Sequence, residues 1–265
     1  MPYTHRIGRA SALLVGKINA VDLLASDPFF GGWGSHRFLN IAFVAPPSGV
    51  VPPTIAGAIF STRRGAWSYT AIAYDPNDQT NDYWVDDLFT DGVNLSFSPA
   101  WNGTVAQRAT TIGVTAAYST ARGANLSEIL LPPDLKTGDK RGSYNIALQV
   151  AHLLEESAVQ KGKGLGVYGK AAMADGNPNP IRASLVGGLA AHGVITARPW
   201  DGVGVGYFYY DLSDDLSDSL APVVPVRPPT TSVCRARTRR SGPCSTASAP
   251  PRSAGRRPWS RGRSG

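Results

Sequence analysis

The chain has 265 residues, of which 17% are charged, and it carries a formal net charge of +7. This share of charged residues is below the roughly 25% of typical soluble domains, and the sequence contains 29 glycines. No apolar run reaches the length of a transmembrane helix, about 18 residues. A membrane barrel stays open as a fold class, because only alternate residues of a barrel strand face lipid.

The positive charge is confined to the C-terminal segment. Residues 227–265 contain ten arginines and no acidic residue, and they are rich in proline, serine and alanine. Removing these ten from the 26 basic residues leaves 16 against 19 acidic ones, so residues 1–226 are mildly acidic. We therefore predict a folded domain at 1–226 and a disordered tail at 227–265, with a composition typical of out-of-frame translation. Binding of nucleic acid or anionic lipid by this tail is the less favoured interpretation.

The N-terminal segment has basic residues before a short apolar run. Arg6 and Arg9 precede an apolar run that Gly16 and Lys17 interrupt, and no convincing cleavage site follows. We therefore do not interpret this segment as a signal peptide.

Four strands are predicted from weak alternation in the first part of the chain. Apolar residues at every second position predict them, in chain order, at 11–18, 37–44, 54–62 and 66–74.

The alternation is strongest in the middle of the chain. Residues 93–98 read VNLSFS, in which every second side chain is apolar and the others are Asn or Ser. Residues 111–118 and 143–150 have the same period, with mostly Thr, Ala, Asn and Gln at the alternate positions. A period of two over this length predicts half-buried strands.

Three further strands are predicted near the end of the folded domain. Residues 164–173 and 182–195 flank the sequence DGNPNP at 175–180. Gly and Asn tolerate positive φ and proline fixes φ, so this hexapeptide predicts a turn. Residues 202–210 read GVGVGYFYY, in which valines and tyrosines alternate with glycines before two further aromatics. The chain therefore contains about ten predicted strands and no comparable helical pattern.

The predicted connections alternate in length. Residues 62–66 and 101–107 are short connections, whereas 75–91 and 119–141 are long and polar. Short turns at one end and long loops at the other are typical of a transmembrane β-barrel. Aromatic residues near strand ends predict the interfacial girdles of such a barrel, and they are Trp67, Tyr74, Trp101, Tyr118, Tyr144, Trp200, Tyr209 and Tyr210.

A soluble or secreted β-sandwich that binds carbohydrate or a surface partner is the alternative. Both folds alternate apolar and polar residues, and they differ only in whether lipid or a second sheet covers the apolar face. Predicted strands of about 8–11 residues and polar faces of Ser, Thr, Asn, Gln and Gly favour the barrel.

Six segments carry a resemblance to a known family. They are GKIN (16–19), HRFLNIAFV (36–44), YDPNDQTND (74–82), DLFTDGVN (87–94), GLGVYGKAAMADGNPNP (164–180) and ARPWDGVGVGYFY (197–209). In this order they resemble the carbohydrate-selective (OprB-type) porins of Gram-negative outer membranes, over roughly residues 7–226. The resemblance implies an all-β fold, an antiparallel transmembrane β-barrel of sixteen strands, and passive diffusion of glucose and related sugars.

The resemblance also implies partners and a location. The location is the outer membrane. The partners are small carbohydrate solutes, outer-membrane lipid and, at full length, two further copies in a homotrimer, and no specific nucleic acid is expected. About ten of sixteen strands are visible, the chain begins inside the family pattern, and strands expected after Val226 are replaced by the tail. We therefore expect a partial barrel that cannot close.

A pore of this type is a channel and not an enzyme, and we expect no catalytic residue, cofactor or metal. It needs polar groups that replace part of the hydration of a sugar. Candidates from the polar faces of predicted strands are Asn94, Ser96, Thr111, Thr115, Asn145, Gln149 and Lys170. Candidates that match the family motifs are Lys17, Asn19, Arg37, Asn40, Asp75, Asn77, Asp78 and Arg198.

Bland explanations compete with these functional ones. Each candidate also fits an ordinary solvated strand or turn residue. The acidic pairs at 86–87 and 214–215 suggest a Ca²⁺ site, but adjacent acids in a long loop are more often solvated.

Overall fold

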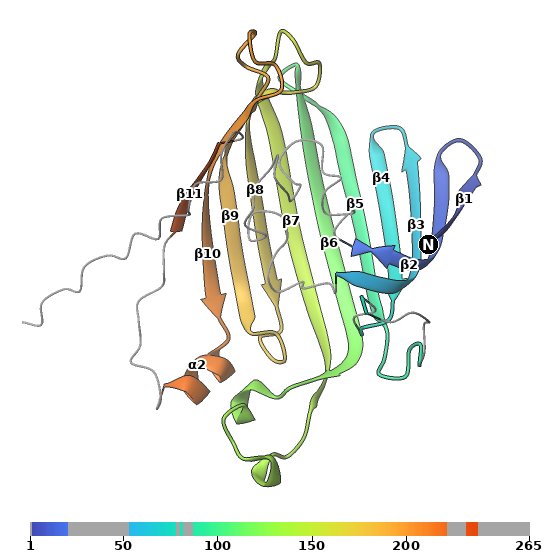
Figure 1. The fold of residues 1–265 in the computed structure, drawn as a ribbon, viewed down its shortest axis with the longest axis vertical. Helices are drawn as coiled ribbons and strands as arrows, with labels where there is room; N and C mark the ends of the chain where they lie inside the picture. Colours follow the sequence, from blue (N-terminus) through green and yellow to red (C-terminus); the bar gives the residue numbers. More distant parts are fainter. Residues whose placement is uncertain (1, 21–52, 78–79, 82–86, 222–231, 238–265) are drawn as a thin grey trace, which may run out of the picture.

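The computed structural model describes residues 2–20, 53–77, 80–81, 87–221 and 232–237. These residues form one antiparallel sheet of eleven strands whose spatial order follows the chain (Figure 1). The strands are β1 (Tyr3–Ile7), β2 (Ser11–Asn19), β3 (Thr54–Arg64), β4 (Trp67–Tyr74), β5 (Asn94–Val105), β6 (Arg108–Gly123), β7 (Lys140–Glu156), β8 (Gly164–Ala174), β9 (Ile181–His192), β10 (Gly202–Leu212) and β11 (Ser232–Arg237).

The single sheet decides between the two predicted architectures. Every described strand pairs with its neighbours in sequence, and no second sheet is present in the described part of the chain. The all-β prediction of a porin-type wall is confirmed, and the sandwich alternative is wrong. Among the described strands β1 and β11 do not pair with each other, so the described sheet is open.

Most predicted strands are present. Nine of the ten predicted segments coincide with β2 to β10, and the tenth, 37–44, lies outside the described residues. The predicted connection at 101–107 is wrong, because β5 continues to Val105 and the turn consists only of Ala106 and Gln107 at positive φ. The Asn-Gly pair at 102–103 resembles a turn signal, but ladder bonds to β6 hold it extended.

The sequence analysis missed β1, β11 and a short helix. Strand β11 lies within the segment predicted as a disordered tail and pairs with β10, Val203 opposite Arg237. The rest of that tail lies outside the described residues, so the domain boundary after residue 226 stays a prediction. Helix α2 (Asp214–Leu220) and the 3₁₀ turns η3 (Leu126–Glu128) and η4 (Pro133–Leu135) lie in loops. None of the described helices is long and apolar enough to cross a membrane.

The connections divide the sheet into two ends. Segments 8–10, 65–66, 106–107, 157–163 and 193–201 join strands at one end, uppermost in Figure 1, which we call the short-turn end. Strands β2, β4, β6 and β10 end at the opposite end, called the long-loop end, and 16 to 34 residues separate each of them from the next strand in sequence. The predicted alternation of loop lengths is therefore confirmed, with the compact turn at 175–180 as an exception.

One face of the sheet, which carries Phe97 and is called the outer face, is apolar and exposed; the opposite face is called the inner face. Phe97 is 50% exposed, and its register neighbours on the same face are also apolar. Exposed apolar side chains continue along this face on β6 to β10, and they include Ile112, Val114, Ile146, Leu148, Leu185, Leu189, Val203 and Val205. A soluble monomer seldom exposes so large a continuous apolar surface, whereas the wall of a membrane barrel does.

Aromatic side chains lie near both ends of the outer face. Trp67 pairs with Trp101 toward the short-turn end, and Tyr118 pairs with Tyr144 toward the long-loop end. Two such bands are typical of a barrel wall at its membrane interfaces. Tyr74 and Tyr210 were also expected in a girdle, but the register places both on the inner face. Trp200 lies in the connection 193–201.

The inner face has an apolar cluster where β2, β3 and β4 approach the long-loop end. Ile18, Ile55, Ile59 and Tyr74 form a buried cluster there, and Ile55 is only 1% exposed. Full burial of one such aliphatic side chain stabilises the fold by about 1.5–3 kcal/mol. This cluster fixes the position of the strands that carry the polar groups described next.

Candidate functional site

A row of hydroxyl groups crosses four strands on the inner face. Ser61 on β3 lies opposite Thr70 on β4, and Thr70 lies opposite Ser98 on β5. The Ser98 and Thr115 hydroxyls then form a hydrogen bond of 2.9 Å between β5 and β6. We call these four residues the hydroxyl row. Each hydroxyl both donates and accepts, so the row matches the hydrogen-bonding pattern of a polyol.

A second set of polar groups lies beside this row toward the short-turn end. The Asn102 side-chain amide donates to the Ser68 hydroxyl at 3.1 Å. The Thr111 hydroxyl donates to the Asn102 carbonyl oxygen at 3.1 Å. The Ser68 hydroxyl in turn donates to the backbone carbonyl of Ala100 at 3.3 Å. These bonds orient three polar side chains of β4, β5 and β6.

The polar surface continues onto β7 and β8. Gln149 lies opposite Lys170, and Gln149 also lies opposite Gly113 on β6. A side chain at Gly113 would meet the Gln149 amide nitrogen at 2.9 Å, so Gln149 extends over the glycine. Asn145 lies further along β7 on the same face and is buried. The three strand candidates Asn145, Gln149 and Lys170 therefore share the inner face with the hydroxyl row.

Asp75 has a different environment from the one expected for a sugar-path residue. Its side chain is 0% exposed. One carboxylate oxygen accepts from the backbone N–H of Asn77 at 2.8 Å, and the other accepts from the backbone N–H of Phe89. The Asn77 side chain donates to Asp91 at 3.0 Å. Asp75 and Asn77 thus bond to groups of the loop after β4, and their place in a sugar path stays a prediction.

The other motif candidates that the structure describes also lie away from the polar rows. Arg198 forms an ion pair of 2.7 Å with Asp201 inside its own turn. Strand β2 pairs with β3 without a register shift, so Lys17 and Asn19 lie on the same face as Leu13, which is the outer face. Their predicted place on the inner face is therefore not supported by the strand alternation. Arg37, Asn40 and Asp78 lie outside the described residues.

Asn177 is a central residue that the sequence analysis treated only as part of a turn. It is 3% exposed, and its amide donates to Asn125 at 2.9 Å and to Asp215 at 2.7 Å. Its carbonyl oxygen accepts from the backbone N–H of Leu126 at 3.2 Å. Asn177 thus joins the 175–180 turn, η3 and α2. A buried amide with all these groups satisfied is a strong constraint on three loops.

Two loop carboxyls at this end have shifted acidities. Hydrogen bonds from the side chain and the backbone of Thr137 lower the pKa of the Glu128 carboxyl. Burial raises the pKa of Asp175, and the hydrogen bond from the Asn179 amide opposes that rise.

The acidic pair at 214–215 has protein partners. Asp214 forms an ion pair with Arg182, and Asp215 accepts from Asn177. Within the described residues there is no group of three or more side chains that could hold a metal.

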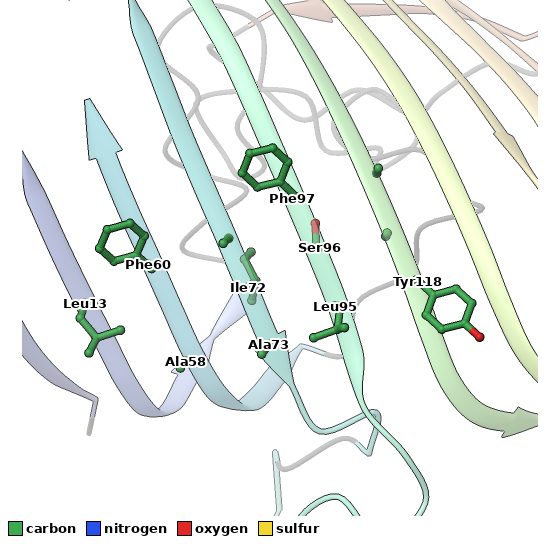
Figure 2. A pocket seen from close by; sticks show the side chains of 12 residues that line it. Leu13, Ala58, Phe60, Ile72, Ala73, Leu95, Ser96, Phe97 and Tyr118 are labelled. Atoms are coloured by element: carbon green, nitrogen blue, oxygen red, sulfur yellow. The ribbon is translucent and has the colours of Figure 1, made fainter. Parts of the chain in front are cut away.

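The outer face contains a shallow apolar trough of about 480 Å³ across β2 to β6. Figure 2 shows the small side chains of Ala58 and Ala73 between the larger ones of Phe60, Leu95 and Phe97. The trough lies on the face opposite the hydroxyl row. The two faces of these strands therefore differ sharply in polarity.

Comparison with known proteins agrees with an all-β wall of the porin type. The sequence matches the family "Carbohydrate-selective porin, OprB family" over residues 12–224. The chain belongs to this family. A solved structure, "High pH structure of Pseudomonas putida OprB", superposes with a TM-score of 0.66 at 15% sequence identity. The alignment covers 82% of this chain and 55% of that chain.

These comparisons establish the family and the fold. At 15% identity the solved structure supports the porin fold alone. The chain spans about half the length of the solved porin that it matches. No curated protein matches the sequence.

Proposed function

We propose that this chain forms part of the wall of an outer-membrane channel that passes sugars of the glucose type by passive diffusion. The observation that carries the proposal is the hydroxyl row, because it opposes an exposed apolar face on the same strands. Polar groups on one side and apolar groups on the other suit a wall between a water-filled path and lipid.

The chemistry of passage follows from the character of these groups. Hydroxyls and amides exchange hydrogen bonds with a sugar for hydrogen bonds with water, with a net gain of only about 1 kcal/mol per bond. Several weak sites in a row favour entry without preventing release. Ser98 and Thr115 share one hydrogen bond, so one hydroxyl proton and several lone pairs remain for water or a sugar.

The partners follow from the outer face. Outer-membrane lipid covers the exposed apolar side chains, with the aromatic bands at its two interfaces. A homotrimer at full length stays a prediction, which mass determination of the detergent-solubilised protein tests.

The test is glucose entry into liposomes that contain the full chain, measured by osmotic swelling. Insertion is verified first by protection of the strands from external protease. Because the described sheet is open, a conducting path requires that several copies of the chain close the wall together. At a high ratio of protein to lipid we therefore expect swelling in glucose above that of empty liposomes. The variants Ser98→Val and Thr115→Val replace hydroxyls by apolar groups and should lower the rate several-fold. Phe97→Leu, on the outer face of the same strand, should leave the rate within about twofold, because it removes no hydrogen bond.

Two outcomes contradict the proposal. A chain that does not partition into the membrane is not a membrane wall. A chain that inserts but passes no glucose, or passes it equally well in the Val variants, has no sugar path along the hydroxyl row.

A further inference from the structure

The inner face also contains a basic groove at its short-turn end. Arg6, Arg9 and Arg63 line this groove, which has a volume of about 570 Å³. We propose that it binds the oxyanion of an acidic sugar, a carboxylate or a phosphate, while adjacent hydroxyls contact the sugar itself. The sugar part of this inference rests on the proposed function, whereas the oxyanion site does not.

The strand register places the arginines together. Arg6 on β1 lies opposite Ala12 on β2, and Ala12 lies opposite Ser61 of the hydroxyl row. The backbone N–H of Arg63 donates to the carbonyl oxygen of Ala10 at 2.9 Å, so Arg63 lies one row nearer the turn. The residues between the two arginines are alanines. Their small side chains leave the groove open between two guanidinium groups.

Hydroxyl groups line the same groove. Ser61, Ser68 and Thr70 contribute side chains to it, and all three belong to the polar surface described above. A guanidinium donates two parallel hydrogen bonds to a carboxylate or phosphate. Hydroxyls at the next positions along β3 and β4 match the hydroxyl groups of a sugar. The combination fits a ligand with an acidic end and a polyol body.

The local charge is uncompensated. Strands β1 to β4 and the turns 8–10 and 65–66 contain no Asp or Glu. The ion pairs found among the described residues involve only Arg182 and Arg198. Arg6, Arg9 and Arg63 are exposed and have no carboxylate partner in that part of the chain. Most acidic side chains of the described loops lie at the opposite, long-loop end, so the groove attracts anions.

The neighbouring arginine provides a matched control. Arg64 follows Arg63 and lies opposite Trp67, whose face is the outer one. It has the same charge and lies in the same hairpin, but it does not line the groove. A ligand bound in the groove should therefore contact Arg63 and not Arg64, although both arginines contribute equally to the net charge.

The test is calorimetric titration of the full chain in zwitterionic detergent with D-gluconate, D-glucose and inorganic phosphate. We expect gluconate to bind about tenfold or more tightly than glucose, the effect of one or more charge-assisted hydrogen bonds. Arg63→Gln and Arg6→Gln should each weaken gluconate binding about tenfold. Arg63→Lys keeps the charge but loses the bidentate geometry, so it should give a smaller loss. Arg64→Gln should change the affinity by less than about twofold.

Three results overturn the inference. The first is equal affinity for gluconate and glucose. The second is an equal loss in the Gln variants of Arg63 and Arg64, which would indicate diffuse charge attraction. The third is a headgroup site, in which Arg63→Gln weakens binding to anionic but not zwitterionic vesicles and leaves gluconate affinity unchanged. Titration in detergent needs no conducting pore, so its failure is distinct from a failure of glucose-driven swelling.

Discussion

The buried amide of Asn177 donates to the carboxylate of Asp215 at 2.7 Å, and this bond ties the turn between β8 and β9 to helix α2. The same amide donates to Asn125 next to η3. Ser219 on α2 reinforces the junction, because its hydroxyl donates to the carbonyl oxygen of Leu126 at 2.9 Å. Asn177 and Ser219 thus join three loops of the long-loop end, while ladder bonds hold the adjoining strands.

Removal of this amide should loosen all three loops together. In Asn177→Ala the backbone N–H of Leu126 loses its acceptor, and the Asn125 and Asp215 oxygens lose a donor. Leaving such buried groups unsatisfied costs about 1–3 kcal/mol. Hydrogen exchange should accelerate at 125–128 and 213–220 but not in β7. Asn179→Ala, which removes an amide bonded to Asp175, is the control. Faster exchange confined to 175–180 in Asn177→Ala would contradict the prediction.

Two adjacent glycines of β9 should respond oppositely to alanine. A Cβ at Gly188 would lie 2.2 Å from the backbone carbonyl oxygen of Val205, which cannot move without separating β9 from β10. A Cβ at Gly187 would lie 3.5 Å from the carbonyl oxygen of Tyr168, an ordinary contact. We expect Gly188→Ala to lower the urea midpoint of the detergent-folded chain, as overpacking costs about 1–3 kcal/mol. Gly187→Ala should leave the midpoint unchanged or raise it. Equal midpoints for the two variants would refute this.

The carboxylate of Asp75 should control the order of the loop after β4. In Asp75→Ala the backbone N–H groups of Asn77 and Phe89 lose their acceptors. Their amide exchange should accelerate about tenfold or more, since an unmet buried donor costs about 1–3 kcal/mol. Asp91→Ala removes an exposed acceptor in the same loop and is the comparison. If the two variants exchange alike, Asp75 has no special role in this loop.

The two shifted loop carboxyls should affect stability in opposite directions as pH changes. The pKa of Glu128 is lowered in the fold, so its stabilising contribution is present above the unfolded-state pKa and is lost as pH falls through the folded-state pKa. The pKa of Asp175 is raised, so its contribution is present below the unfolded-state pKa and is lost as pH rises through the folded-state pKa.

Carboxyl ¹³C shifts measured by NMR test this pair. The Asp175 carboxyl should titrate above the ordinary range of an aspartate, and the Glu128 carboxyl below that of a glutamate. Thr137→Val removes a hydroxyl that donates to Glu128 and should raise the Glu128 midpoint. An unchanged midpoint in that variant would show that the hydroxyl is not the cause.

The distribution of polar and apolar residues over the two faces was readable from the sequence. Side chains in a strand alternate with a period of two, so any correct strand assignment determines which residues share a face. Alternation placed Asn145 and Gln149 on one face of their strand, and the register adds Lys170 to that face. Asp75 and Asn77 were named from the family motifs instead, and their hydrogen bonds could not be read from the sequence, because a loop has no period.

The sequence does not show which residues of different strands meet. Alternation within each strand does not show that Arg6, Ser61 and Ser98 lie in one row across the sheet, because the row depends on the register between neighbouring strands. Register follows from turn geometry and from packing of the whole sheet. Likewise, Asn177 gains its partners from residues far away in the sequence. Most strands and the faces of their residues were therefore predictable from local alternation, whereas the sites depend on long-range pairing, because those contacts form only when the sheet is assembled.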